Sequence, residues 1–236
     1  MKLSVSKKRE IIQSDSPPEF TPPVSEETNW QAVKKYLIGK RKLPSALVDS
    51  LHNSGLIYAD EKQNAVFLRR SMDEAKITGA NLRGTAGTDN KFKGLAKGTK
   101  RNQGWFYFSQ GGQSSDPINR VVLVESPIDA MSFAVLDRNQ SRKTIYLSTD
   151  GAGEIPHLFL PTLKEVVIAY DNDEAGNLMA QRVKSQLPDA VRKLPQAVDW
   201  NEDLVNTFDW SSSPPTQNNQ THRAGPTRER NGGLSL

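Results

Sequence analysis

The sequence predicts an α/β protein in which a small, basic α+β domain precedes an open parallel sheet with helices on both faces. From residue 120 on, apolar strand patterns alternate with helical patterns, which indicates parallel strands joined by right-handed crossovers. Between residues 56 and 108, short strand patterns follow one another without intervening helices. The first 115 residues hold 19 Lys and Arg against 11 Asp and Glu, whereas the remainder holds 12 against 16.

The composition limits the classes of function. A length of 236 residues allows one large domain or two small ones. The absence of cysteine excludes disulfides, thiolate zinc sites and a cysteine nucleophile. No run is apolar enough to span a membrane, and the N-terminus lacks the apolar segment of a secretory signal. We therefore expect a cytoplasmic protein with no membrane partner.

Changes in composition divide the chain into four segments. Residues 1–24 contain four prolines and no periodic apolar pattern, and we expect a disordered tail there. Residues 25–115 form the predicted basic, nucleic-acid-binding α+β domain, which ends in a linker at 110–117. Residues 118–206 form the α/β domain. Residues 207–236 are rich in Ser, Pro, Asn, Thr and Arg, and we expect them to be disordered.

Two short helices open the basic domain. Residues 25–38 form the first, because Trp30, Val33 and Leu37 fall on one helical face. Residues 43–54 form the second, with a proline near its start and a glycine past its end. The pair either packs as a plain helical module or forms a DNA-reading helix-turn-helix, and the sequence does not separate the two.

Strands follow these helices. The segments 56–59 and 65–68 flank the loop 60–64, a composition typical of a β-hairpin. A weaker strand pattern covers 77–82, and 104–108 is a further predicted strand.

A Gly-rich, basic stretch crosses these strands. Residues 62–101 hold 10 basic and 3 acidic side chains. Glycine lets the backbone approach a polyanion closely, and cations neutralise its charge. The candidate nucleic-acid-binding residues are Arg69, Arg70, Arg83, Lys91, Lys93, Lys97, Lys100 and Arg101. On the alternative interpretation these cations only solvate a surface. Phe92 either stacks on a base or, as we expect, fills the core.

The second half alternates regularly between strands and helices. We expect strands at 120–125, 144–148, 165–170 and 190–194, and helices at 127–136, 173–187 and 199–205.

Carboxylates stand at the ends of two of these strands. Glu125 ends the first strand, Asp129 follows four residues later, and Asp171 and Asp173 end the third. The carboxyl ends of strands in open α/β sheets meet at the ligand-binding crevice. Carboxylate oxygens suit hard cations such as Mg²⁺. The sequence therefore predicts a Mg²⁺-dependent phosphate-handling site, although each acid could alternatively cap a helix.

Smaller residues lie near these acids. Ser148, Thr149 and Gly151 end the middle strand in the same crevice, where they either cradle a phosphate or form a simple turn. Gly176 lies where a helix meets the sheet, and we expect a packing role for it.

The spacing of the acids resembles the Toprim domain of bacterial DNA primases, topoisomerases and several nucleases. The resemblance covers roughly residues 118–205 and includes Glu125, Asp171-x-Asp173 and the run Asp173-Glu-Ala-Gly176. Glu125-x-x-x-Asp129 looks like the acidic first motif of bacterial primases.

A second acidic motif extends the resemblance. Asp199-Trp-Asn-Glu-Asp-Leu is similar to the motif after the last strand in primases and primase-like proteins of mobile elements. Asn201 stands where a primase typically has a second acid. The basic half resembles, more weakly, the subdomain that precedes Toprim in primases, and an uncharacterised domain found beside Toprim in plasmid and phage proteins.

The resemblance implies roles for particular residues. Glu125, Asp171 and Asp173 would be catalytic. Mg²⁺, with Mn²⁺ as a substitute, would be held by Glu125, Asp129, Asp171, Asp173 and Asp199. The implied function is a primase-like nucleotidyltransferase that acts on single-stranded DNA with nucleoside triphosphates.

Other functions stay open on the same residues. The acids would also serve a Toprim nuclease, or persist in a non-catalytic DNA-binding module of a mobile-element replication system. A helicase or another replication or relaxase protein is a candidate partner. A topoisomerase would need a catalytic tyrosine in a separate DNA-gating domain, and this chain has no such segment.

Overall fold

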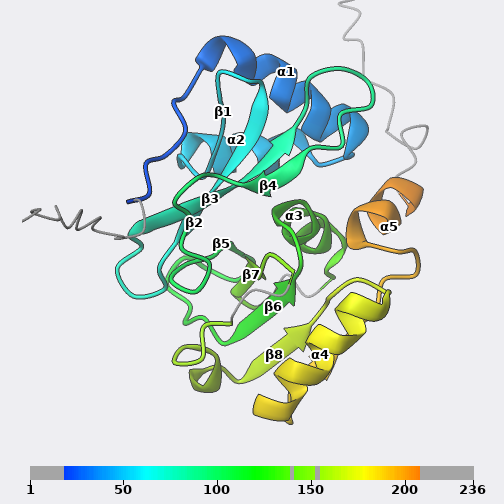
Figure 1. Cartoon of the computed structure of the whole chain (residues 1–236). Coiled ribbons are helices and arrows are strands. Elements are labelled where there is room, and N and C mark those ends of the chain that lie inside the picture. Colours follow the sequence, from blue (N-terminus) through cyan, green and yellow to red (C-terminus); the bar gives the residue numbers. More distant parts are fainter. Residues whose placement is uncertain (1–18, 139–140, 152–154, 208–236) are drawn as a thin grey trace, which may run out of the picture.

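Two β-sheets organise the molecule (Figure 1). A computed structural model describes residues 19–138, 141–151 and 155–207. The first sheet is antiparallel with strand order β1-β2-β3-β4, and the second has the order β5-β7-β6-β8-β9. The predicted α/β class, with a small α+β unit before a mostly parallel sheet, is confirmed.

The first half contains the predicted helices and one more strand than predicted. Its helical segments are η1 (Glu27–Asn29), α1 (Trp30–Lys35), the π-helical turn η2 (Tyr36–Lys40) and α2 (Ser45–Asn53). Its strands are β1 (Ile57–Ala59), β2 (Asn64–Arg70), β3 (Ile77–Gly84) and β4 (Lys93–Leu95). β4 lies within the Gly-rich basic stretch, where no strand was predicted.

The second sheet and the helices around it make up the rest of the fold. Its strands are β5 (Phe106–Gln110), β6 (Arg120–Val124), β7 (Thr144–Ser148), β8 (Glu165–Ile168) and β9 (Val191–Arg192). Its helices are α3 (Pro127–Leu136), the short η3 (Leu160–Thr162), α4 (Glu174–Gln186) and α5 (Trp200–Thr207).

The predicted hairpin between β1 and β2 forms around one carboxylate. Asp60 accepts hydrogen bonds from the backbone N–H groups of Lys62 and Asn64, at 2.9 and 2.8 Å. Gln63 adopts the left-handed conformation that reverses the chain, with φ of 58°. The β1–β2 pairing that follows confirms the prediction.

The second sheet is parallel except at one edge. β6 pairs in parallel with β7 and β8, and β8 with β9, as predicted. β5 pairs with β7 in antiparallel fashion, although it precedes the predicted linker at 110–117 in the sequence. Phe106 and Phe108 of β5 pack in the core against aromatic neighbours, which favours this edge position.

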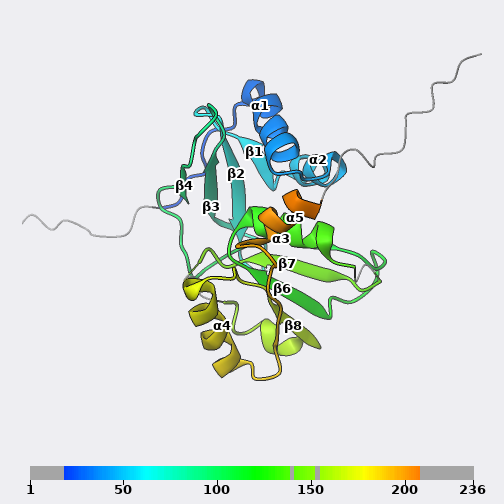
Figure 2. The same ribbon diagram turned by 90° about the vertical axis from the view of Figure 1, so that its right-hand side faces the viewer.

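Helices cover both faces of this sheet, as Figures 1 and 2 show. α3 and α5 pack on one face, where Phe133 meets Trp200 with ring centroids 4.5 Å apart. α4 packs on the other face through Met179, Ala180 and Val183. No helix within the described ranges is long and apolar enough to cross a membrane.

One hydrophobic core runs through both halves. It joins Trp30 and Leu37 of the first helical segment and Phe67 of β2 to Phe106 of β5 and Met131 of α3. Burial of this shared apolar surface fixes the first sheet over the edge of the second where the parallel strands end. The helical pair α1 and α2 contributes its apolar face to this core, so plain packing accounts for that face.

Candidate metal and phosphate site

A cavity of about 410 Å³ lies between the two halves. Its lining combines the carboxyl ends of the parallel strands with β3, β4 and the turn after η2. We call four of its lining residues the acidic floor: Glu125, Asp129, Asp171 and Asp199. We call four others the basic wall: Arg41, Arg83, Lys93 and Arg101.

A helix cap positions Asp129. Ser126 follows Glu125 and caps α3, and its hydroxyl accepts a hydrogen bond from the backbone N–H of Asp129 at 3.2 Å. The same hydroxyl donates to the Asp129 carboxylate at 2.5 Å. Asp129 is only 5% exposed. Burial, and then the negative charge of Asp199, raises the pKa of Asp129 to about 7.

Asp171 is the carboxylate most affected by its surroundings. Its Oδ1 atom is buried and has no hydrogen-bond partner within the described residues. Burial raises the pKa of Asp171 to about 8, with further contributions from Asp129, Glu125, Asp199 and Asp173. An unpaired carboxylate oxygen among other acids is stable only with a proton or a cation beside it.

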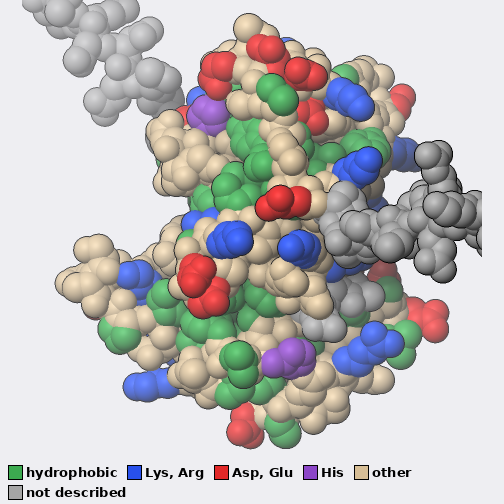
Figure 3. Space-filling model, turned by 60° about the vertical axis from the view of Figure 1, so that its left-hand side comes forward, with side chains coloured by type: hydrophobic (Ala, Val, Ile, Leu, Met, Phe, Trp, Pro, Cys, Tyr) green, Lys and Arg blue, Asp and Glu red, His purple; other side chains and the backbone are tan. Residues whose placement is uncertain are grey.

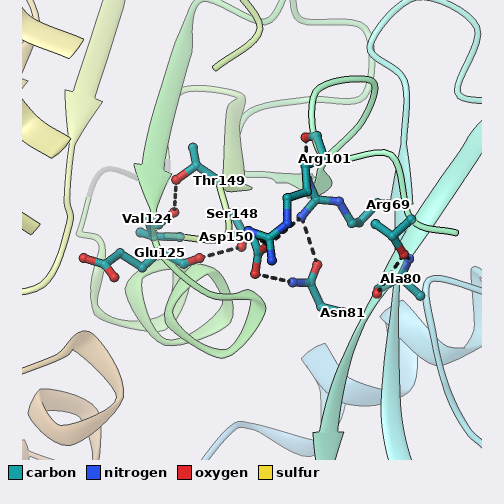
Figure 4. Close-up of polar contacts among 10 residues, drawn as sticks. Arg69, Ala80, Asn81, Arg101, Val124, Glu125, Ser148, Thr149 and Asp150 are labelled. Carbon is teal, nitrogen blue, oxygen red and sulfur yellow. Dashed lines mark hydrogen bonds and ion pairs between the residues drawn. The ribbon is translucent and has the colours of Figure 1, made fainter. Parts of the chain in front are cut away.

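Glu125 is tied to both neighbouring strands. Its Oε1 accepts a hydrogen bond from the backbone N–H of Asp171 at 3.3 Å, and its carbonyl accepts one from the Ser148 hydroxyl at 3.0 Å. Burial raises the pKa of the Glu125 carboxyl. Ser148 and Thr149 are buried, and both hydroxyls bond to carbonyls at the end of β6 (Figure 4), so they brace the strand end.

Asp173 is placed differently from the acidic floor. It caps α4, and its Oδ1 accepts a hydrogen bond from the Gly176 N–H at 2.8 Å. Its side chain is exposed and does not line the cavity. The alternative interpretation of the acids as helix caps therefore holds for this residue.

Gly176 has the packing role that we expected. A Cβ atom at this position would lie 2.2 Å from the carbonyl oxygen of Asp171. Only glycine therefore lets the start of α4 approach the end of β8, and this approach holds Asp171 beside the other strand ends.

Asp199 closes the acidic floor from α5. Its Oδ1 accepts a hydrogen bond from the backbone N–H of Glu202 at 2.7 Å, which ties it to the first turn of the helix. The neighbouring Asn201 is buried, and it donates to the Arg41 carbonyl at 2.8 Å and to the Ser132 hydroxyl at 2.9 Å. α5 thus joins the acidic floor to the basic wall.

The donor chemistry of the acidic floor fits a hard divalent cation. All its candidate ligands are carboxylate oxygens, and Asp171 offers one that has no hydrogen-bond partner among the described residues. Within the described ranges, no three His, Cys, Asp or Glu side chains converge closely enough to hold a metal ion. Binding would therefore require side-chain rotation toward Asp171.

Three of the eight basic candidates line the cavity, namely Arg83, Lys93 and Arg101. Arg69 is completely buried, and its guanidinium lies 3.8 Å from the Asp150 carboxylate. Arg101, which is 62% exposed, lies 3.7 Å from the same carboxylate. Asn81 completes the group by donating to Asp150 at 3.0 Å, as Figure 4 shows. Arg69 thus positions Asp150 from inside the protein.

The remaining basic candidates lie away from the cavity lining. Arg70 donates to the Tyr107 carbonyl at 3.0 Å and lies over the Tyr107 ring. The other three, Lys91, Lys97 and Lys100, are exposed. On the face seen in Figure 3, basic, acidic and apolar side chains are interspersed and form no continuous basic strip. Phe92 is 49% exposed, so our expectation that it fills the core is wrong, because β4 is an edge strand.

Sequence reasoning missed two charged residues of the site. Asp150 follows β7 by two residues and adopts a left-handed conformation with φ of 59°, which is costly for a residue other than glycine. A signal existed, since it follows a strand as Glu125 and Asp171 do. Arg41 follows an irregular helix in a Lys- and Arg-rich turn, and nothing in that pattern separates it from a surface cation.

Comparisons with known proteins agree with this geometry. Residues 122–204 match a family model described as Toprim-like. This part of the chain is a Toprim-like domain. The match covers the strands and helices that carry the acidic floor. Residues 35–114 match a family described as a protein of unknown function, DUF3991, and this segment precedes Toprim here as the resemblance implied.

Two known proteins are similar to most of the chain. The uncharacterized protein pXO2-78 of Bacillus anthracis is 26% identical over 167 residues, which cover 67% of this chain and 48% of that protein. The chain therefore spans about half the length of this curated relative. The primase fragment of the bacteriophage T7 primase-helicase protein superposes with a TM-score of 0.52 at 16% identity, covering 81% of this chain and 79% of that one. At this identity the likeness shows a shared primase-like fold.

Proposed function

We propose that this protein is a Mg²⁺-dependent, primase-like nucleotidyltransferase that joins nucleotides on single-stranded DNA. The observation that carries the proposal is the shared cavity, which is lined by both the acidic floor and the basic wall. Phosphoryl transfer needs negative charge neutralised and the reacting groups aligned, with little covalent help from the protein. The Toprim-like domain and the primase-like fold support this reaction class.

Each charged group has a role in this proposal. Glu125, Asp171 and Asp173 would hold the metal ion, with Asp129 and Asp199 beside them. When bound, Mg²⁺ would neutralise phosphate oxygens and lower the pKa of the attacking hydroxyl. Asp173 would contribute the carboxylate oxygen that does not cap α4. The metal-free pKa of Asp171, about 8, means that cation binding displaces a proton from the acidic floor near neutral pH.

The protein's own groups would orient the substrates. Arg83, Lys93 and Arg101 line the same cavity as the acids, where they would draw the phosphates of template and nucleotide inward. The hydrogen bonds from Ser148 and from the Asp171 backbone hold the Glu125 carboxylate and its strand end in place. The remaining candidates Lys91, Lys97 and Lys100 would contact the strand outside the cavity.

The test is de novo synthesis by the full chain on single-stranded DNA, with labelled nucleoside triphosphates and Mg²⁺ or Mn²⁺. We expect short products from the wild type and none from Asp171→Asn. Degraded template without products, again lost in the variant, would favour the Toprim nuclease. Template binding without either reaction would favour the non-catalytic module, provided that an added helicase or relaxase partner restores nothing.

The context of the relatives suits a mobile-element replication system. The Bacillus anthracis relative carries a pXO2 designation, and the DUF3991 and Toprim-like segments stand side by side in this chain as in the uncharacterised plasmid and phage proteins of the resemblance. A helicase or relaxase partner belongs to the same proposal.

A further inference from the structure

Two arginines of the basic wall converge on a single buried phenol. The Tyr36 hydroxyl accepts a hydrogen bond from Arg41 Nε at 2.8 Å and another from Arg83 Nε at 3.0 Å. Tyr36 belongs to η2 and is only 9% exposed. Arg41 comes from the turn after η2 and Arg83 from β3, so two distant segments bring their charges to one oxygen atom.

This pairing places like charges side by side without a counter-charge. Two Nε atoms on one oxygen at these distances lie no more than about 6 Å apart, where two cations repel each other. Within the described ranges neither guanidinium forms an ion pair with a carboxylate. Arg41 bonds instead to the neutral amide of Asn201, through Nη1 at 3.0 Å.

The contacts hold each arginine through its Nε atom and leave Nη groups available to a ligand. For Arg83, no hydrogen bond of either Nη group is present in the described part of the chain. For Arg41, one Nη group bonds to Asn201 and the guanidinium lies 5.4 Å from the centre of the Tyr36 ring. Both side chains line the cavity of the acidic floor. Arginine forks held in this way suit bidentate binding of phosphate oxygens.

We propose that Arg41 and Arg83, bridged by Tyr36, form a subsite for the polyphosphate chain of a nucleoside triphosphate. This inference rests on the proposed function and names the substrate group that the basic wall binds. In a triphosphate several negative charges lie on adjacent, directly linked phosphates. In a nucleic-acid strand each phosphate carries one charge and is separated from the next by a sugar. A paired cationic site without its own carboxylate matches the concentrated charge better.

Asn201 couples this subsite to the metal-binding side of the cavity. Its side chain accepts from Arg41 Nη1, and donates to the Arg41 carbonyl and to Ser132 of α3. The preceding acid Asp199 lies two residues away on the same helix start. The α5 N-terminus thereby fixes the spacing between the arginine pair and the acidic floor, which is the spacing that a bound triphosphate would bridge.

The test measures binding, apart from any reaction. Equilibrium dialysis of the full chain would give the affinities for ATP, for inorganic tripolyphosphate and for a single-stranded DNA oligonucleotide, in EDTA and again with Mg²⁺. The variants are Arg41→Met, Arg83→Met and Tyr36→Phe, which removes only the bridging oxygen. Arg182→Met on the exposed face of α4 is the matched control.

We expect each arginine variant to weaken ATP and tripolyphosphate binding about 10- to 100-fold, as charge-assisted hydrogen bonds are lost. Tyr36→Phe should weaken both ligands less, and its effect should be smaller in the Arg83→Met background, because one of the two arginines that Tyr36 holds is then gone. DNA affinity should change by less than about threefold, because each arginine variant removes only one of several cations that would contact the strand. The control should match the wild type for all three ligands.

Other outcomes would overturn the proposal. Loss of DNA affinity with unchanged ATP affinity would assign the arginines to the nucleic-acid backbone. Absence of tripolyphosphate binding by the wild type, or unchanged affinity in both arginine variants, would also refute the subsite. Circular dichroism checks the folding of each variant. If Arg41→Met misfolds, Arg83→Met and Tyr36→Phe still decide the question.

The result is separable from the proposed reaction. Dialysis in EDTA measures binding at the subsite even if no product forms. If the arginine variants bind ATP as the wild type does and still synthesise DNA, the subsite is refuted while the proposed reaction stands.

Discussion

The acidic floor and the basic wall face the same cavity, yet they are built in different ways. Carboxylates of the acidic floor follow strands or begin helices, and burial raises the pKa values of Asp129 and Asp171 to about 7 and about 8. Cations of the basic wall come from a turn, from β3 and β4 and from a loop, and Arg41 and Arg83 are held by the neutral groups Tyr36 and Asn201.

This difference shows which charged groups of the protein would be stabilised by bound ligands. The acidic floor is unfavourable by itself, because burial and mutual repulsion raise the pKa values of Glu125, Asp129 and Asp171. The basic wall is unfavourable through the closeness of its two bridged arginines. A metal ion with a polyphosphate would relieve both. Asp150 links the two parts of the protein by ion pairs, because it follows β7 of the second sheet and pairs with Arg69 and Arg101 of the first half.

The largest expected effect comes from breaking this link. Asp150→Asn keeps the shape and tolerates the left-handed backbone, but it leaves the buried guanidinium of Arg69 without its counter-charge. Burial already lowers the pKa of Arg69, and Asp150 opposes that effect. We expect a loss of about 3 kcal/mol in the free energy of unfolding.

Urea unfolding would measure this loss. The exposed Asp89→Asn is a suitable control, since the same charge is removed without a buried partner. Equal stabilities of the two variants would show that Asp150 does not join the two halves electrostatically.

The second effect isolates the acidic floor. Asp171→Asn should weaken Mn²⁺ binding by at least about 100-fold, since the loss of even an outer ligand partner costs 10- to 100-fold. Thermal shift on addition of Mn²⁺ would measure it. The same variant should be more stable than the wild type in EDTA above about pH 8, where the wild-type carboxyl is charged and the amide is neutral. Reduced metal-free stability would contradict our account of the acidic floor.

The pH dependence follows from the same carboxyl group. The pKa of Asp171 is about 8 in the folded protein against 3.8 ordinarily, so the folded state binds this proton more tightly than the unfolded chain does. The resulting stability is fully present below about pH 4 and is lost as the pH rises through about 8. Urea unfolding in EDTA should therefore show lower stability at pH 8 than at pH 5.5, with a smaller difference in Asp171→Asn.

How much of this was accessible from the sequence differs between the two regions. The strand-end acids Glu125 and Asp171 could be predicted, because the carboxyl ends of parallel strands must meet at one edge of a sheet. The burial of Arg69 could not be predicted, because Arg69 and Arg70 are the same residue type in adjacent strand positions. Only the sheet pairing decides which of the two side chains points inward. The arginine pair on Tyr36 depends on tertiary contacts between residues 47 positions apart.

The fold shows the same division. Local alternation predicted β6 to α4 within a few residues. The same reasoning put β5 with the preceding strands, because nothing local indicates that it pairs with β7 across the linker. The domain boundaries themselves stay predictions.

A third, intermediate effect concerns the approach that holds Asp171. Gly176→Ala places a methyl group 2.2 Å from the Asp171 carbonyl, and we expect a cost of about 1–3 kcal/mol in unfolding free energy, with weaker Mn²⁺ binding. Gly39→Ala in η2 has open space around it and should change stability by less than about 0.5 kcal/mol. Chemical denaturation of both variants measures the contrast. Equal costs would mean that α4 shifts freely away from β8.

The smallest effect belongs to the rim of the basic wall. Arg101 is 62% exposed and pairs with Asp150 at 3.7 Å, so Arg101→Met should cost less than about 1 kcal/mol in unfolding free energy. It should nevertheless lower the affinity for single-stranded DNA and reduce its salt dependence, which a titration at several salt concentrations would show. A large loss of stability would instead place Arg101 among the residues that join the halves.

The edge position of β5 also bears on how such proteins are inherited. β5 lies inside the 35–114 family match but completes the sheet of the 122–204 match. A gene rearrangement that cut between the two matches would move the sheet edge from β5 to β7, a strand that is buried along its whole length, and an exposed edge of this kind promotes aggregation. We therefore expect a Toprim-like domain that lacks the preceding segment to aggregate more readily than the whole chain. The two segments are expected to travel together through recombination as one unit.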